Sequence, residues 1–235
     1  MRQSKNCAAP RRIRAIIFDF DGLILDTEMP AFQSWQELFA EHGQHLPLEV
    51  WARAIGASLA EFDTAVHLQE LVGLPLDLDA LRAARLARKV ELLAEADALP
   101  GVREYIAGAR RLGLRLAIAT SSGRGWADAQ LARLGLLEAF EAIVCADDVQ
   151  AAKPDPALFL AALRRLGVTA DEAIAIEDSP NGITAARAAG IFCVAVPNEL
   201  TLQLGVDHAD LVLSSLEEMP LKELLVRATR PGTSR

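Results

Sequence analysis

The sequence predicts a doubly wound α/β fold built on a mainly parallel sheet, with an all-helical segment inserted near its start. Short apolar runs alternate with helical segments along most of the chain, as in a parallel α/β sheet. The runs are continuously apolar, as expected of strands covered on both faces. The chain has 235 residues, 51% of them hydrophobic, which suits one domain carrying a large insertion.

Five apolar runs predict buried parallel strands, and LVLSS at 211–215 is a candidate sixth. The five runs are RAIIF at 14–18, LRLAIAT at 114–120, AIVCAD at 142–147, AIAIED at 173–178 and IFCVAV at 191–196.

Helices are predicted between these strands because their ends carry capping and stop signals. Glycines end four of them, and a Ser or Asp followed by Pro opens two. Four helices are predicted. The first follows Pro100-Gly101 and stops at Gly113, and the second spans 126–134 before Gly135. The third runs from Asp155-Pro156 to Gly167, and the fourth from Ser179-Pro180 to Gly190.

The interval 28–99 breaks the alternation, because it shows helical periodicity and no convincing strand. Its apolar residues recur at helical spacing, in one set near its start and one near its end. In open α/β sheets ligands bind at the carboxyl ends of strands, so an insertion leaving from that edge would cover the site. The predicted division is a core of 13–27 and 100–225, a helical cap of 28–99, and tails of 1–12 and 226–235. The two sets are Phe32, Trp35, Leu38 and Phe39, and Leu86, Val90 and Leu93.

Composition excludes several classes of function. A net charge of −8 favours neither nucleic acid nor an anionic membrane as a partner. No apolar stretch reaches the roughly 20 residues of a membrane helix, and the basic, polar N-terminus does not resemble a signal peptide. Cys7, Cys145 and Cys193 form no disulfide framework, which favours a reducing cytoplasm. The absence of heptads or a long apolar edge predicts a monomer.

Polar residues follow four of the predicted strands. Each motif alone could be a turn, a cap or a solvated loop, but a parallel sheet brings the four strand ends together. So many carboxylates in one cleft would repel one another unless a hard cation neutralised them, and Mg²⁺ suits oxygen ligands. The residues are Asp19 with Asp21, Thr120 with Ser121, Lys153, and Glu177 with Asp178.

The ordered motifs D-x-D-G-x-x-x-D-[ST], strand-end [ST], K-P and E-D-S-x-x-G resemble those of the haloacid dehalogenase superfamily. The resemblance covers about residues 13–220 and is nearest to subfamily IA, whose small helical cap follows the first motif. That group includes β-phosphoglucomutase and many sugar-phosphate phosphatases. The resemblance implies a Rossmann-like core and a Mg²⁺ cofactor.

The same resemblance implies a role for each residue. Asp19 would attack phosphorus and form an aspartyl phosphate, and Asp21 would act as general acid and base. The remaining roles are phosphoryl-oxygen binding by Thr120 and the Ser121 amide, charge compensation and phosphate contact by Lys153, and Mg²⁺ binding by Asp19, the Asp21 main-chain carbonyl, Asp178 and Glu177.

Departures from the mutase pattern favour hydrolysis. The acid at Asp21 favours phosphate esters, since relatives that cleave carbon–halogen or carbon–phosphorus bonds lack it. The β-phosphoglucomutases carry a histidine where this chain has Ala31 and basic residues where it has Ile55 and Leu59. We therefore expect a Mg²⁺-dependent phosphatase acting on a small phosphorylated metabolite, with sugar phosphates as the favoured class. A phosphomutase is the alternative, and a non-catalytic binding protein is less favoured because the acids and the lysine are all present.

Two groups in the cap raise the question of substrate contact. Arg82, Arg85 and Lys89 share a helix face, which is either solvated or turned to the substrate. Arg53 and Gly56 are further candidate contacts, beside a Trp51 that is expected to belong to the core.

Overall fold

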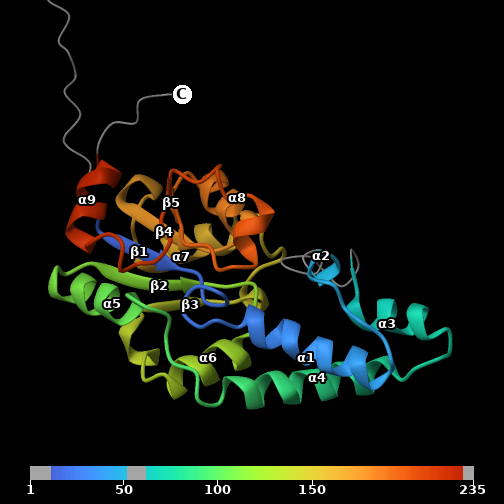
Figure 1. Cartoon of the computed structure of the whole chain (residues 1–235). Coiled ribbons are helices and arrows are strands. Elements are labelled where there is room, and N and C mark those ends of the chain that lie inside the picture. The colour runs from blue at the N-terminus through green and yellow to red at the C-terminus, as the bar shows by residue number, and fades with distance from the viewer. Residues whose placement is uncertain (1–11, 52–61, 230–235) are drawn as a thin grey trace, which may run out of the picture.

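The computed structural model describes residues 12–51 and 62–229, which form a six-stranded sheet with helices on both faces (Figure 1). The strand order is β3-β2-β1-β4-β5-β6, and every neighbouring pair is parallel. The six predicted strands are confirmed, each with narrower bounds. They are β1 Ala15–Phe18, β2 Arg115–Ala119, β3 Ala142–Val144, β4 Ala173–Glu177, β5 Phe192–Ala195 and β6 Leu211–Val212.

Alternate residues of the central strands enter different hydrophobic clusters. Ile16 and Phe18 of β1 pack in one cluster, whereas Ala15 and Ile17 pack in the other. All four are fully buried, because β1 has a strand on each side and helices on each face. This explains why the strand sequences show no polar alternation.

Five helices accompany the sheet among the described residues. Buried residues of α5 (Val102–Arg111), α6 (Arg124–Arg133) and α9 (Leu221–Thr229) join one cluster. Buried residues of α7 (Ala157–Leu166) and α8 (Pro180–Ala188) join the other. Short 3₁₀ turns lie at Leu137–Ala139, Ala146–Asp148, Ala170–Glu172 and Thr201–Leu204.

The predicted helix signals are confirmed with two adjustments of a start. Helix α6 begins at Arg124, two residues earlier than the pattern predicts. Ser179 caps α8 by accepting a hydrogen bond from the Gly182 amide at 3.2 Å, with Pro180 in the first turn. Helix α7 begins at Ala157, one residue later than the pattern predicts, and Asp155 accepts from the Ala157 amide at 2.8 Å.

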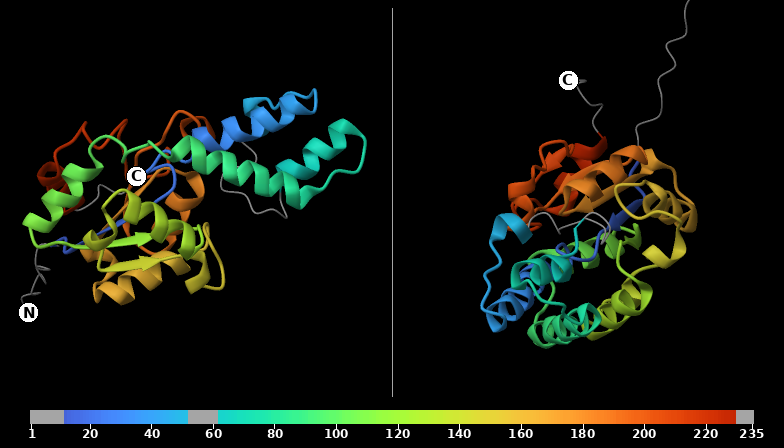
Figure 2. Two further views of the ribbon diagram at one scale, coloured as in Figure 1. Left: turned by 90° about the horizontal axis from the view of Figure 1, so that it is seen from below. Right: turned by 90° about the vertical axis from the view of Figure 1, so that its right-hand side faces the viewer.

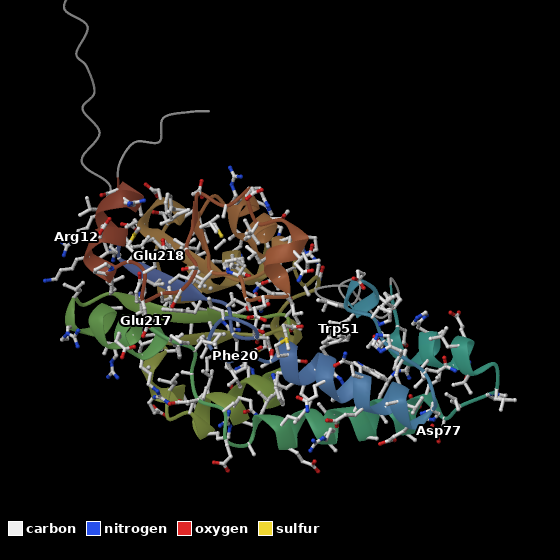
Figure 3. The ribbon with its side chains drawn as sticks, in the orientation of Figure 1. Arg12, Phe20, Trp51, Asp77, Glu217 and Glu218 are labelled. Atoms are coloured by element: carbon white, nitrogen blue, oxygen red, sulfur yellow. The ribbon has the colours of Figure 1, made fainter. Side chains whose placement is uncertain are left out.

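Between β1 and β2 the chain forms a helical segment that extends beyond one end of the sheet (Figures 1 and 2). Its helices are α1 (Glu28–Glu41), α2 (Leu48–Trp51), α3 (Thr64–Val72) and α4 (Leu78–Leu93), and α1 runs alongside α4. The segment has a hydrophobic cluster of its own. Trp51 of α2, labelled in Figure 3, belongs to it and stacks on Phe32 with ring centroids 6.1 Å apart. Trp51 is thus a core residue, as expected.

The prediction that Leu86, Val90 and Leu93 form a buried face of α4 is partly wrong. Leu93 is buried, but Leu86 and Val90 are 49% and 44% exposed. Arg85 and Lys89, each one residue before an exposed apolar residue, are half-buried. Helix α4 packs on α1, and Leu81 belongs to the hydrophobic cluster of the segment.

The chain between α4 and α5 is tied to the α/β part by arginines. Arg133 of α6 donates to the carbonyls of Ala96 and Ala94 at 2.6 and 3.3 Å. Arg103 of α5 pairs with Asp97 at 2.5 Å and also donates to the Leu134 carbonyl after α6 at 3.0 Å. The Leu99 amide donates to the Ile24 carbonyl at 2.8 Å. No helix in the described ranges has both the length and the apolar character needed to cross a membrane.

Candidate active site

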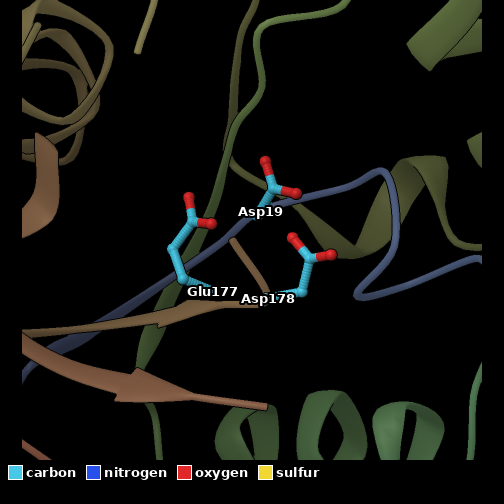
Figure 4. Close-up of side chains that lie close together, drawn as sticks. All are labelled: Asp19, Glu177 and Asp178. Atoms are coloured by element: carbon cyan, nitrogen blue, oxygen red, sulfur yellow. The ribbon is translucent and has the colours of Figure 1, made fainter. Parts of the chain in front are cut away.

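Three carboxylates converge at the carboxyl ends of the central strands. Asp19 follows β1, Glu177 is the last residue of β4, and Asp178 follows it. Their side chains point toward one another, and the candidate ligand oxygens lie within 4.8 Å of each other (Figure 4). The residues are only 5%, 0% and 3% exposed. The topology thus brings together the acids that the sequence predicts from separate strand ends.

Lys153 lies among these acids. Its ammonium contacts Asp19 Oδ1 and lies 2.5 Å from Glu177 Oε1, with 6% of the side chain exposed. The Phe159 ring lies beneath the ammonium, its centroid 5.3 Å away. Burial alone would lower the pKa of Lys153, but the two carboxylates raise it above its ordinary value, so the lysine is charged.

One lysine does not balance the acids. Burial raises the pKa of Asp19 to about 8, with Lys153 opposing the shift and Glu177 adding to it. Burial, followed by repulsion from Asp19 and Glu177, also raises the pKa of Asp178 well above its ordinary value. The three carboxylates of the site therefore carry more negative charge than the single Lys153 ammonium can neutralise. An all-oxygen donor set with excess negative charge fits Mg²⁺.

Two glycines allow the backbone to approach the carboxylates. At Gly22, where φ is +80°, a Cβ would collide with Asp178 Oδ2, and at Gly182 a Cβ would collide with the Glu177 carboxylate. The G of D-x-D-G and the G of E-D-S-x-x-G are therefore spatial requirements of the acidic cluster.

Asp21 lies apart from this cluster and has a different environment. Its half-buried carboxylate accepts from Ser122 Oγ at 2.7 Å, Trp126 Nε1 at 3.0 Å and Thr120 Oγ1 at 3.4 Å. Asp19 faces a cation, whereas Asp21 is oriented by neutral donors. The contact of the Asp21 main-chain carbonyl with a metal stays a prediction.

The predicted phosphate-binding residues lie at the end of β2. Thr120 is 1% exposed, and its Oγ1 also accepts from the Ser122 amide at 3.0 Å. Ser121 is exposed at the edge of the site. Their contacts with a phosphoryl group, like that of Lys153, stay predictions.

Sequence reasoning missed three residues that position the predicted acids. They are Ser122 and Trp126, which hold Asp21, and Asn198, whose Nδ2 donates to Asp178 Oδ2 at 3.0 Å. Asn198 follows β5, so a search of that fifth strand end would have found it. The amides of Leu200 and Thr201 donate to Asn198 Oδ1 at 2.9 Å and fix the amide orientation.

The structure separates the cationic residues of α4. Arg82 pairs with Asp63 at 2.5 Å and Asp79 at 2.8 Å, which turns it away from the acids. Arg85 lies 5.8 Å from the centroid of the Trp35 ring, and Lys89 lies 4.9 Å from that of Trp126. Arg53 and Gly56 lie outside the described residues.

Comparisons with known proteins agree with this geometry. The family model for haloacid dehalogenase-like hydrolases matches residues 16–196. YhcW of Bacillus subtilis is 44% identical over 213 residues, which cover 91% of this chain and 96% of that protein. The "Phosphorylated carbohydrates phosphatase" of Thermotoga maritima is 32% identical, with 76% and 82% of the two chains covered. The crystal structure of CbbY from Rhodobacter sphaeroides in complex with phosphate matches with a TM-score of 0.71 and 32% identity, over 88% of this chain and 96% of that one. This chain belongs to the haloacid dehalogenase-like hydrolase family.

Proposed function

We propose that this protein is a Mg²⁺-dependent phosphatase that hydrolyses a small phosphorylated metabolite through an aspartyl phosphate. The observation that carries the proposal is the pairing of the buried Asp19 with Lys153, beside an Asp21 held by three neutral donors. It gives one acid the setting of a nucleophile and the other that of a proton carrier. The phosphatase name of the Thermotoga maritima relative and the phosphate in the CbbY complex support this class of substrate.

In the first step a carboxylate oxygen of Asp19 attacks phosphorus. The bond between phosphorus and the ester oxygen breaks, and its electron pair goes to the leaving alcohol, which takes a proton from Asp21. Lys153 lies against Asp19 and offsets the negative charge that gathers around phosphorus. Thr120 and the Ser121 amide, at the end of β2, would hold the other phosphoryl oxygens.

In the second step water attacks the phosphorus of the aspartyl phosphate. Asp21, now deprotonated, takes a proton from that water. The acyl–phosphate bond breaks, which releases inorganic phosphate and restores the Asp19 carboxylate. The three donors on Asp21 keep its carboxylate in one orientation for both proton transfers.

The acidic cluster supplies the metal ligands in this proposal. Asp19, Asp178 and Glu177 would hold Mg²⁺, together with the main-chain carbonyl of Asp21. When bound, the ion supplies positive charge to the phosphoryl oxygens. Asn198 would keep Asp178 oriented toward it through the hydrogen bond to Oδ2.

The helical segment 28–99 acts as a cap in this proposal. It leaves the sheet directly after the Asp21 turn and returns before β2, so it can exclude bulk water during the first step and open for the second. Ala31, where mutases would show histidine, is buried in the hydrophobic cluster of this segment, which fits hydrolysis better than transfer back to substrate.

Hydrolysis of p-nitrophenyl phosphate and of a panel of sugar phosphates tests the proposal. We expect turnover with MgCl₂, none with EDTA, and a loss of at least about 10³-fold in kcat for Asp19→Asn. The matched control is Asp79→Asn, whose side chain is 95% exposed, and which should keep the wild-type rate. An Asp19→Asn protein with full activity, or turnover that is indifferent to EDTA, would refute the mechanism.

A further inference from the structure

Three charged side chains of the helical segment face the region beside Asp21. Glu28 is the first residue of α1, and Arg85 and Lys89 lie one turn apart on α4. Lys89 lies over the ring of Trp126, the residue whose indole N–H donates to Asp21. Arg85 lies over the ring of Trp35, which is 6% exposed in α1. Glu28 and Lys89 thus lie close enough to the predicted proton donor, Asp21, to interact with its charge, and Arg85 interacts with Glu28.

These charges are partly withdrawn from water. All three residues are half-buried. Burial raises the pKa of Glu28 and lowers the pKa of Lys89 and of Arg85, although the opposite charges among them act against each shift. Each group thus loses hydration that its neighbours only partly replace.

The three side chains also lack close partners in the described part of the chain. No hydrogen bond or ion pair joins the Glu28 carboxylate or the Lys89 ammonium to another described residue, and Arg85 Nε is buried with no acceptor. Two other arginines of the same helix differ. Arg82 pairs with Asp63 and Asp79, and Arg88 pairs with Glu37 at 2.7 Å and Glu91 at 3.0 Å. Among the described residues, helix α4 thus pairs Arg82 and Arg88 with acids and gives Lys89 and Arg85 Nε no such partner.

Half-buried charges of both signs beside a reaction site favour a ligand that both donates and accepts hydrogen bonds. A hydroxyl group does both, since it can donate to Glu28 and accept from Lys89 or Arg85. An alkyl chain would cover all three charges without pairing any of them. A second phosphate would gain from the two cations but meet the Glu28 carboxylate.

We propose that Glu28, Lys89 and Arg85 form the subsite for the alcohol part of the substrate, and that this part is a polyhydroxylated chain. The inference rests on the proposed phosphatase function and specifies the substrate class of that site. The leaving oxygen lies at Asp21 and the neighbouring hydroxyls lie against Glu28 and the α4 cations.

Matched pairs of phosphate esters test the proposal. The polyol series is glycerol 1-phosphate, erythritol 4-phosphate and ribitol 5-phosphate, and the alkyl series is n-propyl, n-butyl and n-pentyl phosphate. We expect the wild-type kcat/KM to favour at least one polyol over the alkyl ester of equal length by about 10- to 100-fold, because unpaired polar groups penalise the alkyl ester. Glu28→Gln and Lys89→Met should each lower this ratio to below about 3, mainly by slowing the polyol.

Arg88→Met is the matched control, because Arg88 lies on the same helix but pairs with surface acids. It should keep both rates and their ratio, and circular dichroism of each variant checks that the fold is retained. A wild-type enzyme that hydrolyses p-nitrophenyl phosphate yet favours no polyol overturns the subsite alone. Equal losses on both series in Glu28→Gln and Lys89→Met also overturn it. Absence of turnover on p-nitrophenyl phosphate and on both series refutes the phosphatase function, and the subsite falls with it.

Discussion

Asp19 and Asp21 stand one residue apart and have opposite surroundings. Asp19 is buried against Lys153, whereas Asp21 is half-buried and accepts from Ser122, Trp126 and Thr120. The difference arises because β1 ends at Phe18 and the chain turns at Gly22, so the two side chains no longer share the regular spacing of a strand. Two identical residue types can therefore take different parts in one reaction.

The raised pKa of Asp19 predicts that the metal-free protein loses stability as pH rises. The pKa is about 8 in the folded chain against an ordinary value of 3.8, so between these values the folded state holds a proton that the unfolded chain has released. The free energy of unfolding should therefore fall as pH rises from 5.5 to 8 in EDTA. Asp19→Asn removes this term and should raise the stability at pH 8 by about 1–3 kcal/mol.

Urea denaturation at both pH values measures the effect. Histidine titration contributes equally to wild type and variant, so the difference between the two proteins isolates Asp19. Two results would show that Asp19 is already ionised and well compensated in the metal-free fold. One is an Asp19→Asn protein that is less stable than the wild type at pH 8. The other is a difference in unfolding free energy between the two proteins that does not change with pH.

The acids were predictable from sequence, because residue type and position at a strand end suffice to bring them together. Lys153 lies well beyond the end of β3 at Val144, so the K-P motif, and not a strand end, predicted its place in the site. The supporting residues were not predictable from sequence. Trp126 lies inside a predicted helix, where an aromatic residue indicates packing, and only the placement of α6 beside the Asp21 turn reveals its indole N–H as a donor. Asn198 follows β5, where the sequence shows a polar loop with no motif.

At the scale of elements, helix α8 begins against the carboxylate that ends β4. Ser179 caps the helix and lies 3.4 Å from Glu177 Oε2, and Gly182 in the next turn leaves room for the same carboxylate. The start of the helix and the carboxylate cluster are thus one packed unit, and a change in one disturbs the other.

Gly182→Ala should damage both folding and activity. The added Cβ has no space beside Glu177, so either α8 or the carboxylate must shift. We expect a loss of about 1–3 kcal/mol in unfolding free energy and about 100-fold in kcat. Gly125→Ala in the first turn of α6 is the control, because a Cβ there meets open space, and it should leave stability unchanged or raise it by up to about 1 kcal/mol. Equal behaviour of the two variants in thermal unfolding and phosphatase assays would contradict this account.

Helix α4 shows where periodicity misleads. Leu86 and Val90 recur at helical spacing, but they are exposed, and the face that turns inward is the one that carries Arg85 and Lys89. The periodicity of apolar residues predicts which face of a helix is buried when that face packs against a hydrophobic core. A helix that borders a polar site turns charges inward instead, and the sequence alone does not show which helix does so.

At the scale of the whole molecule, the strand order makes β1 central and directs the chain out of the sheet immediately after the predicted nucleophile. The helical segment is therefore joined to the α/β part by two connections, one after Asp21 and one between α4 and α5. Alternation of apolar runs predicted the sheet and the place of the insertion. It could not predict how α1 and α4 pack on each other, which depends on contacts between distant segments.

The whole-molecule arrangement predicts hydrolysis without phosphoryl return. With each phosphate ester, the amount of inorganic phosphate released should equal the amount of substrate consumed. No phosphorylated isomer should accumulate, even when the substrate is β-glucose 1-phosphate and a bisphosphate activator is added. Phosphorus-31 NMR of the reaction measures both quantities. Formation of an isomer without free phosphate would instead identify a mutase. Groups other than the histidine that mutases carry at the position of Ala31 would then have to hold the second phosphate of the bisphosphate.

The contact between Trp126 and Lys89 joins the two parts of the molecule through an aromatic ring. Its indole lies with the α/β part, and the ammonium above it belongs to the helical segment. Any opening of that segment withdraws a positive charge from the ring and changes its emission. With Trp35 and Trp51 replaced by phenylalanine, Trp126 would be the sole tryptophan, since the chain has three in all. The emission of Trp126 in that variant would therefore report the proposed opening and closing of the segment.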